Sequence, residues 1–108
     1  MVPIPRTLLP DIATVYLRDP DSDYEGSYLE PTEMRYVRFE RAEQLSGQGY
    51  KLTDGATGRV WIDKVNTIGA MEVPAGSKLV IGGETLKVAK CMPHRDMLHI
   101  HHWELDVI

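Results

Sequence analysis

The residues best suited to chemistry lie near the C-terminal end, where three histidines occur within four positions, at His99, His101 and His102. Two histidines separated by one residue on the same strand can chelate a metal ion. A nearby carboxylate such as Glu104 would supply a third ligand. These residue types at this spacing therefore raise the hypothesis of a metal site, provided that the local structure makes the side chains converge.

The alternation of side chains along a strand decides whether they converge. The pattern over 98–107 predicts a strand, so His99 and His101 share one face with Trp103. The opposite face carries His102 and Glu104. The histidines are thus divided between two faces, and Glu104 lies on the opposite face from the His99 and His101 pair. This separation favours a structural strand, which we expect to close the sheet through the next inward-facing residues, Leu105 and Val107.

The set of His99, His101 and Glu104 is similar to part of the cupin metal motif, which implies a small metal-dependent β-barrel enzyme. Such an enzyme would use His99, His101 and a third ligand such as His94. The cupin pattern continues into further strands that carry another histidine, whereas four residues follow Glu104 here. We therefore expect no catalytic, cofactor-binding or metal-binding residues, and the cupin-like enzyme is the alternative. Metal analysis of the purified protein and of His101→Ala would separate the two hypotheses.

Other candidate sites are weaker. Cys91 and His94 have the spacing of zinc ligands, but the sequence has no second cysteine to complete such a site, so we expect Cys91 to be a small buried thiol at a strand end. A cysteine–histidine nucleophile would need the two side chains to meet, and no pattern in the sequence places them together. The chain has no GxSxG nucleophile elbow and no glycine-rich phosphate loop before a helix.

The charge balance argues against nucleic-acid binding. The formal net charge is -4, so no overall positive field attracts phosphate. Arg35, Arg38 and Arg41 suggest a basic stripe, but strand alternation is expected to point Arg38 away from the other two. An oligonucleotide-binding barrel would also need exposed aromatic residues interleaved with basic ones, and the chain has a single Phe.

The pattern along the chain predicts one all-β domain over 11–108, preceded by a proline-rich arm over 1–10. Alternating or β-rich segments predict strands over 12–18, 33–41, 59–64, 78–81, 84–90 and 98–107. The two glycines at 82–83 predict a tight hairpin turn. A small antiparallel barrel or two-layer sandwich of five to six strands is the natural way to bury the apolar faces of these strands.

The remaining segments are expected to be loops. Polar and glycine-rich residues over 43–58 indicate a long loop with at most one short strand, and no amphipathic helix is expected. Residues 92–96 are expected to form a loop around Pro93. The acidic segment 19–32 is longer than most connections in compact domains, which is typical of contact loops. It lacks the glycine and closing glutamate of a helix-loop-helix calcium site.

The cellular setting follows from composition. A single cysteine excludes an internal disulfide and fits assembly in a reducing compartment. The first ten residues have no apolar run long enough for a signal peptide or membrane span, so we expect the protein to be made in the cytoplasm.

Both ends of the chain resemble the minor capsid proteins encoded among the head and connector genes of tailed bacteriophages. The hairpin over 74–90 is similar to the family's GSKIxxxGxxYxV segment, and 98–108 is similar to its terminal HHxELxV strand. The segment 4–10 resembles its proline-bracketed start. Two departures, Leu86 for an aromatic residue and Trp103 for a tyrosine, keep apolar side chains.

This resemblance implies a virion structural protein at the head–tail interface that completes the head. Such a protein would form a homo-oligomeric ring under the portal or an adaptor protein, extend the DNA channel and meet tail-side connector proteins, with no membrane partner. If the acidic loop lines the channel, Asp21, Asp23 and Glu25 would repel DNA and keep it sliding. The sequence therefore predicts an assembly part with no enzymatic activity.

Overall fold

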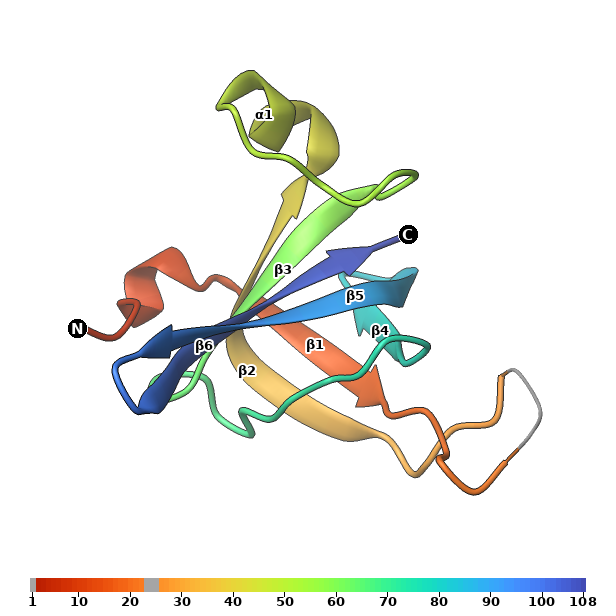
Figure 1. Cartoon of the computed structure of the whole chain (residues 1–108). Coiled ribbons are helices and arrows are strands. Elements are labelled where there is room, and N and C mark those ends of the chain that lie inside the picture. Colours follow the sequence, from red (N-terminus) through yellow and green to blue (C-terminus); the bar gives the residue numbers. More distant parts are fainter. Residues whose placement is uncertain (1, 23–25) are drawn as a thin grey trace.

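The chain folds into an antiparallel β-barrel of six strands, closed in the order β1-β2-β3-β6-β5-β4, as seen in a computed structural model that describes residues 2–22 and 26–108 (Figure 1). The predicted all-β fold, with its arm and long loops, is confirmed. No helix in the described part of the chain is long and apolar enough to span a membrane. The strands are β1 (Asp11–Tyr16), β2 (Thr32–Arg41), β3 (Gly58–Asp63), β4 (Lys78–Ile81), β5 (Glu84–Asp96) and β6 (His99–Val107).

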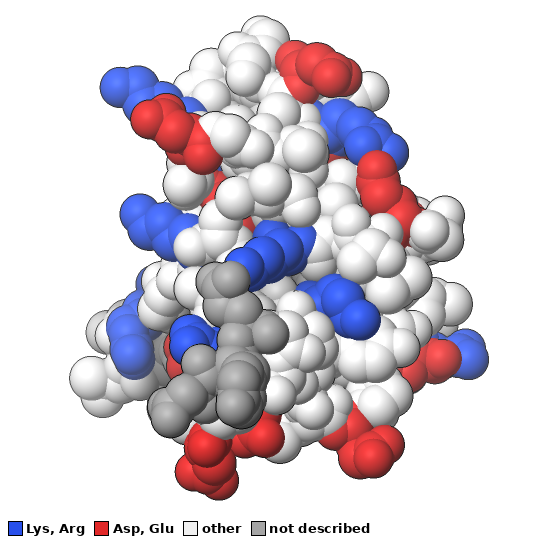
Figure 2. All heavy atoms as spheres, turned by 90° about the vertical axis from the view of Figure 1, so that its right-hand side faces the viewer, with Lys and Arg blue, Asp and Glu red and all other residues white. Residues whose placement is uncertain are grey.

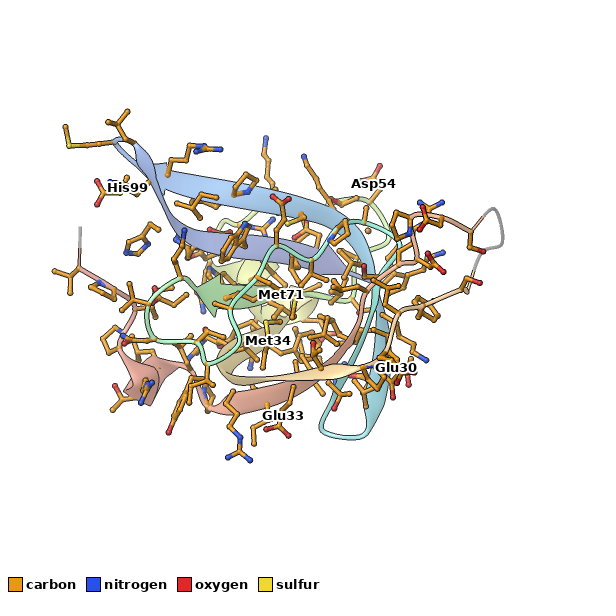
Figure 3. All side chains as sticks on the ribbon, turned by 90° about the horizontal axis from the view of Figure 1, so that it is seen from below. Glu30, Glu33, Met34, Asp54, Met71 and His99 are labelled. Carbon is orange, nitrogen blue, oxygen red and sulfur yellow. The ribbon has the colours of Figure 1, made fainter. Side chains whose placement is uncertain are left out.

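The inward-facing side chains of the six strands form one hydrophobic core. Met34 is fully buried and Met71 packs against the core from the connection between β3 and β4. Figure 3 shows these two methionines near the centre of the molecule, whereas His99 lies far out at the end of the β5–β6 hairpin. The buried members are Ala13, Val15, Met34, Val37, Val60, Ile62, Val73, Leu79, Ile81, Leu86, Val88, Trp103, Leu105 and Val107.

A bulge in β2 changes which of its side chains share a face. Asp11 pairs with Val37 and Ile12 with Arg35, so Tyr36 is an extra residue in β2 and has a φ of 64°. The inward phase shifts there, which is why Met34 and Val37 are both buried. The expectation that Arg38 points away from Arg35 is therefore wrong, because both follow the outward phase on either side of the bulge.

The arginines of β2 are engaged with carboxylates. Arg35 pairs with Glu33 at 2.6 Å, and Arg38 pairs with Glu40. On the other face, Arg41 lies 2.9 Å from Glu84 of β5. These pairs leave no unpaired arginine stripe along β2 for a nucleic-acid backbone.

β5 continues through the segment that was expected to be a loop. Pro93 pairs with Trp103 and His94 with His102, so residues 92–96 belong to the strand and the prediction of a loop is wrong. A second bulge, between Val88 and Lys90, shifts the inward phase of β5. Proline has no backbone N–H to donate to a neighbouring strand. Pro93 is tolerated because β4 pairs with β5 only as far as Lys87, so no strand on that side of Pro93 needs the donor. The predicted turn at Gly82 and Gly83 is present, with φ values of 57° and 80°.

A short helix, α1 (Ala42–Gly47), follows β2 directly, and residues 48–57 form turns with no strand. The prediction of a loop with a possible strand over 43–58 therefore missed the helix. Leu45 is the buried residue of α1, while Tyr50 packs edge-on against Trp61 of β3 at 6.2 Å between ring centroids. A single buried leucine gives too little periodicity to reveal a helix of this length.

The N-terminal arm contacts the barrel, with a single 3₁₀ turn, η1, at Arg6–Leu8. The backbone N–H of Ile4 donates to Oδ1 of Asp63 at 2.9 Å, and Asn66 donates back to the carbonyl oxygen of Ile4 at 2.8 Å. The guanidinium of Arg6 lies 4.4 Å from the ring centroid of Tyr36, and Leu9 is 1% exposed. The aromatic ring of Tyr36, at the bulge in β2, is thus one of the contacts that hold the arm on the barrel.

The β1–β2 connection is closed at its base. Arg18 and Tyr28 form an isolated β-bridge, and Lys78 lies over the rings of both Tyr16 and Tyr28. Asp21 is exposed, while Asp23 and Glu25 lie outside the described residues. Acidic and basic side chains are interspersed on the face at this end of the molecule, and neither sign covers it alone (Figure 2).

Candidate functional site on the β5–β6 hairpin

The register of β5 and β6 assembles a cluster of two histidines and a glutamate on the outer face of the barrel. His94 lies opposite His102, and their rings stack with centroids 4.7 Å apart. Both Nε2 atoms approach the same carboxylate oxygen, Oε2 of Glu104, at 3.0 Å from His94 and 2.8 Å from His102. We call His94, His102 and Glu104 the histidine–glutamate cluster.

The histidines expected for a cupin-like enzyme do not converge. His99 is exposed near the hairpin end (Figure 3), and His101 directs its Nε2 to the carbonyl oxygen of Val2 at 2.7 Å. The Nδ1 atoms of His101 and His102 are 2.9 Å apart. His102 and Glu104 share a face as predicted, but sequence reasoning missed His94 as their partner because it treated that residue as part of a loop.

Arg59 of β3 holds Glu104 of the cluster in place through the second oxygen of its carboxylate. Its side chain is buried and donates to Oδ1 of Asp106 at 2.6 Å and to Oε1 of Glu104 at 3.1 Å. A third bond, to the carbonyl oxygen of Lys51, has a length of 2.8 Å. Thr53 donates to Oδ2 of Asp106 from both its backbone N–H and its hydroxyl, each at 2.8 Å. The turns after α1 thereby cover an ion-pair network on the outside of the barrel.

These contacts set the protonation of the two acids. Burial by itself would raise the pKa of Glu104, but the hydrogen bond from His102 and the charges around it outweigh burial and lower the pKa. Burial acts in the same direction on Asp106, where hydrogen bonds from Arg59 and Thr53 outweigh it and lower the pKa. Both carboxylates are therefore held in their ionised forms.

Arg59 is a residue that sequence reasoning missed. It sits beside Val60 in a short alternating strand, where an arginine on the outward phase is ordinarily solvated. The available signal was the pair of acids, Glu104 and Asp106, two residues apart on one face of the last strand. Two buried carboxylates side by side repel each other unless a cation lies between them. The sequence alone does not reveal which strand supplies that cation.

Cys91 lies inside β5, opposite Leu105, and is half-buried against the core. The expectation of a thiol at a strand end is corrected by the extension of β5 to Asp96. Burial is the main cause that raises the pKa of this thiol. A protonated thiol of this kind is a weak nucleophile, and His94 lies on the outer face with the glutamate.

The end of the hairpin carries the most exposed apolar side chains of the described chain. Met97 is 93% exposed and Leu98 is 87% exposed, and Met97 adopts a positive φ of 51° in the turn. Val2, which is 81% exposed, lies beside His101 of the same hairpin, because its carbonyl oxygen accepts the bond from that residue. We call Val2, Met97 and Leu98 the apolar tip. In Figure 1 the N-terminus and the hairpin end extend from the same side of the barrel.

Comparison with known proteins identifies the family. The family model described as minor capsid protein matches residues 5–107. No curated protein and no solved structure showed significant similarity to the chain. The match covers the second part of the arm, the whole barrel and the β5–β6 hairpin, so it confirms the resemblance that the two ends of the sequence suggested. The chain therefore belongs to the minor capsid protein family, which gives it a structural role in the virion.

Proposed function

We propose that this minor capsid protein completes the phage head at the head–tail junction. In this role, copies of the chain form a ring beneath the portal or an adaptor, extend the DNA channel and present a surface to the tail-side connector proteins. Proteins with this task need contact surfaces for several neighbours and no catalytic residues. The proposal goes beyond membership of the family, which by itself supports a structural role in the virion.

The apolar tip is the observation that carries the proposal. Met97 and Leu98 are almost fully exposed at the end of a two-stranded ribbon that projects beyond the core. Two apolar side chains exposed to water do not contribute to the stability of the isolated chain. Contiguous exposed apolar surface commonly marks a protein interface. A projecting tip fits a neighbour that offers a pocket, which is the head-to-tail contact from which rings are built.

A binding assay with portal rings tests the tip. The double variant Met97→Ser and Leu98→Ser should fold as the parent chain, because both side chains are exposed, and should lose co-migration with portal rings in size-exclusion chromatography. Removing two anchor side chains from an interface typically costs several kcal/mol, or at least a hundredfold in affinity. Ile12→Ser is the matched control, since Ile12 is 49% exposed on β1, away from β6 in the closed order of strands. Equal loss in the control, or full binding by the double variant, would refute the role of the tip.

The acidic β1–β2 loop is proposed to line the channel. Its sequence carries five acidic residues over 19–30, and like charge repels the DNA phosphates and keeps the contact weak. Deletion of residues 21–26 should leave head assembly intact while particles lose packaged DNA or eject it abnormally, measured by DNA content per purified particle. Unchanged assembly together with unchanged DNA retention would show that the loop has no such role.

A further inference from the structure

We propose that His94, His102 and Glu104 bind one divalent transition-metal ion, with zinc as the best match, and that this ion fastens the two strands of the projecting hairpin. The proposal concerns a structural metal site and is independent of the position of the protein in the virion. Three donor atoms carry it: Nε2 of His94, Nε2 of His102 and Oε2 of Glu104.

The spacing of the donors suits a small metal ion. All three atoms lie within 4.8 Å of one another, and the two nitrogens are 3.0 Å and 2.8 Å from the carboxylate oxygen. Around a tetrahedral zinc ion with bonds of about 2.0–2.1 Å, neighbouring donors are roughly 3.3 Å apart. The two nitrogen-to-carboxylate distances would lengthen by a few tenths of an ångström around the ion, and the exposed His94 ring would turn out of its stack on His102 to direct its Nε2 to the ion.

The hydrogen bonds orient the His102 ring so that Nε2 faces the carboxylate of Glu104. The Val2 carbonyl can only accept, so Nε2 of His101 donates to it and Nδ1 of a neutral His101 is an acceptor. When Nδ1 of His102, 2.9 Å away, donates to that acceptor, Nε2 of His102 is the nitrogen that a metal ion can bind in place of a proton. This nitrogen lies 2.8 Å from Oε2 of Glu104, so either a proton on Nε2 or a metal ion must lie between the two atoms. A bond from the second nitrogen of a ligating histidine is the usual way to orient such a ligand.

The balance of buried charges around the cluster also favours a bound cation. Arg59 contributes one positive charge, while Glu104 and Asp106 contribute two negative charges, and all three side chains are largely buried. With neutral imidazoles, one negative charge is left without a buried counterpart, and it lies beside the two Nε2 atoms. Two imidazoles and one carboxylate form a donor set that zinc and neighbouring transition metals prefer, whereas calcium and magnesium prefer oxygen ligands.

The position of the site gives the ion a structural task. It would link His94 on β5 to His102 and Glu104 on β6, in the part of the hairpin between the core and the apolar tip. This part of β5 has lost its pairing with β4, so a cross-strand link would stiffen the ribbon that holds Met97 and Leu98. Three protein ligands leave one position open for water.

Titration of zinc into untagged, chelator-treated protein tests the site by isothermal calorimetry and by thermal unfolding. We expect one equivalent to bind the parent chain with micromolar or better affinity and to raise Tm. His94→Ala, which changes an exposed side chain, should weaken binding at least tenfold and abolish the Tm shift. His99→Ala is the matched control on the same hairpin and should bind as the parent does. His101→Ala should weaken binding about 10–100-fold, as expected for a residue that orients a ligand.

Cobalt(II) provides a second readout, because its visible absorption reports a low-coordinate site and should disappear in His94→Ala. Absence of stoichiometric zinc binding by the parent would overturn the proposal, and a proton shared by His102 and Glu104 would then fill the place of the ion. Zinc binding that persists unchanged in His94→Ala would overturn it as well, because the ion would then be held elsewhere.

Discussion

The carboxylate of Asp106 is almost completely buried, yet it lies on the outer side of the barrel and not in the apolar core. Its position depends on Arg59, which donates to Oδ1, and on Thr53, which donates to Oδ2 from backbone and side chain. Such a network contributes to stability only while every charge is paired, because an unpaired buried charge keeps its full desolvation cost. The turns after α1 owe their place on the barrel to these bonds.

Asp106→Asn is therefore expected to lower the free energy of unfolding by about 3 kcal/mol, since it removes one charge of a buried pair and leaves Arg59 undercompensated. Chemical denaturation in the presence of a chelator measures the loss. Glu33→Gln is the control, because the pair between Glu33 and Arg35 is about half exposed on both sides and should change stability by less than about 1 kcal/mol. Losses of equal size would contradict the assignment of Asp106 as a buried anchor.

The histidines show what the sequence could and could not predict at this scale. Period-2 alternation correctly placed His102 and Glu104 on one face. It wrongly separated His99 from them, because a register shift between His94 and Arg95 pairs His99 with Asp96 and returns it to the outer face. It could not find His94, because that residue reaches the cluster through the register of two strands and the length of β5. Arg59 was missed for the same reason, since its acids lie on a different strand.

At the scale of single elements, the start of β3 depends on a close approach to β2. A Cβ atom added to Gly58 would collide with the carbonyl oxygen of Glu40 and would lie 2.6 Å from Cε1 of Phe39. The backbone oxygen cannot yield without opening the β2–β3 ladder, where Gly58 pairs with Arg41. A glycine is required here for space, not for a special φ.

Gly58→Ala should consequently destabilise the protein by about 1–3 kcal/mol through overpacking, as measured by the midpoint of denaturant unfolding. Gly47→Ala in α1 is the matched control, because an added Cβ meets nothing within 4 Å. That substitution should be neutral or stabilise by up to about 1 kcal/mol. A neutral Gly58→Ala would contradict the close approach of the two strands.

Two of the three register shifts in the described part of the barrel bring apolar residues into the core against the simple alternation. At Tyr36 and between Val88 and Lys90 an extra residue shifts the inward phase, so apolar residues that seem to be on opposite faces enter the same core. No residue type marks such a shift, since Tyr36 has a positive φ without being a glycine. The turn at Gly82 and Gly83 was predictable because two glycines supply that conformation without steric cost.

At the scale of the whole molecule, the barrel was predictable because six short β-rich segments need closure or a second layer to bury their apolar faces. The N-terminal arm and the β5–β6 hairpin lie outside the core and extend from the same side of the barrel (Figure 1). A single chain cannot bury the apolar tip by itself, so the assembled virion must supply the remaining contact surface in the proposed role.

Asymmetric cryo-electron microscopy of complete particles tests this account most directly. It predicts a ring of this six-stranded barrel at the single portal vertex, between portal and tail, with Met97 and Leu98 buried against a neighbouring subunit. Density for the barrel at sites spread over the icosahedral shell, or its absence from the portal vertex, would contradict the proposed place at the head–tail junction.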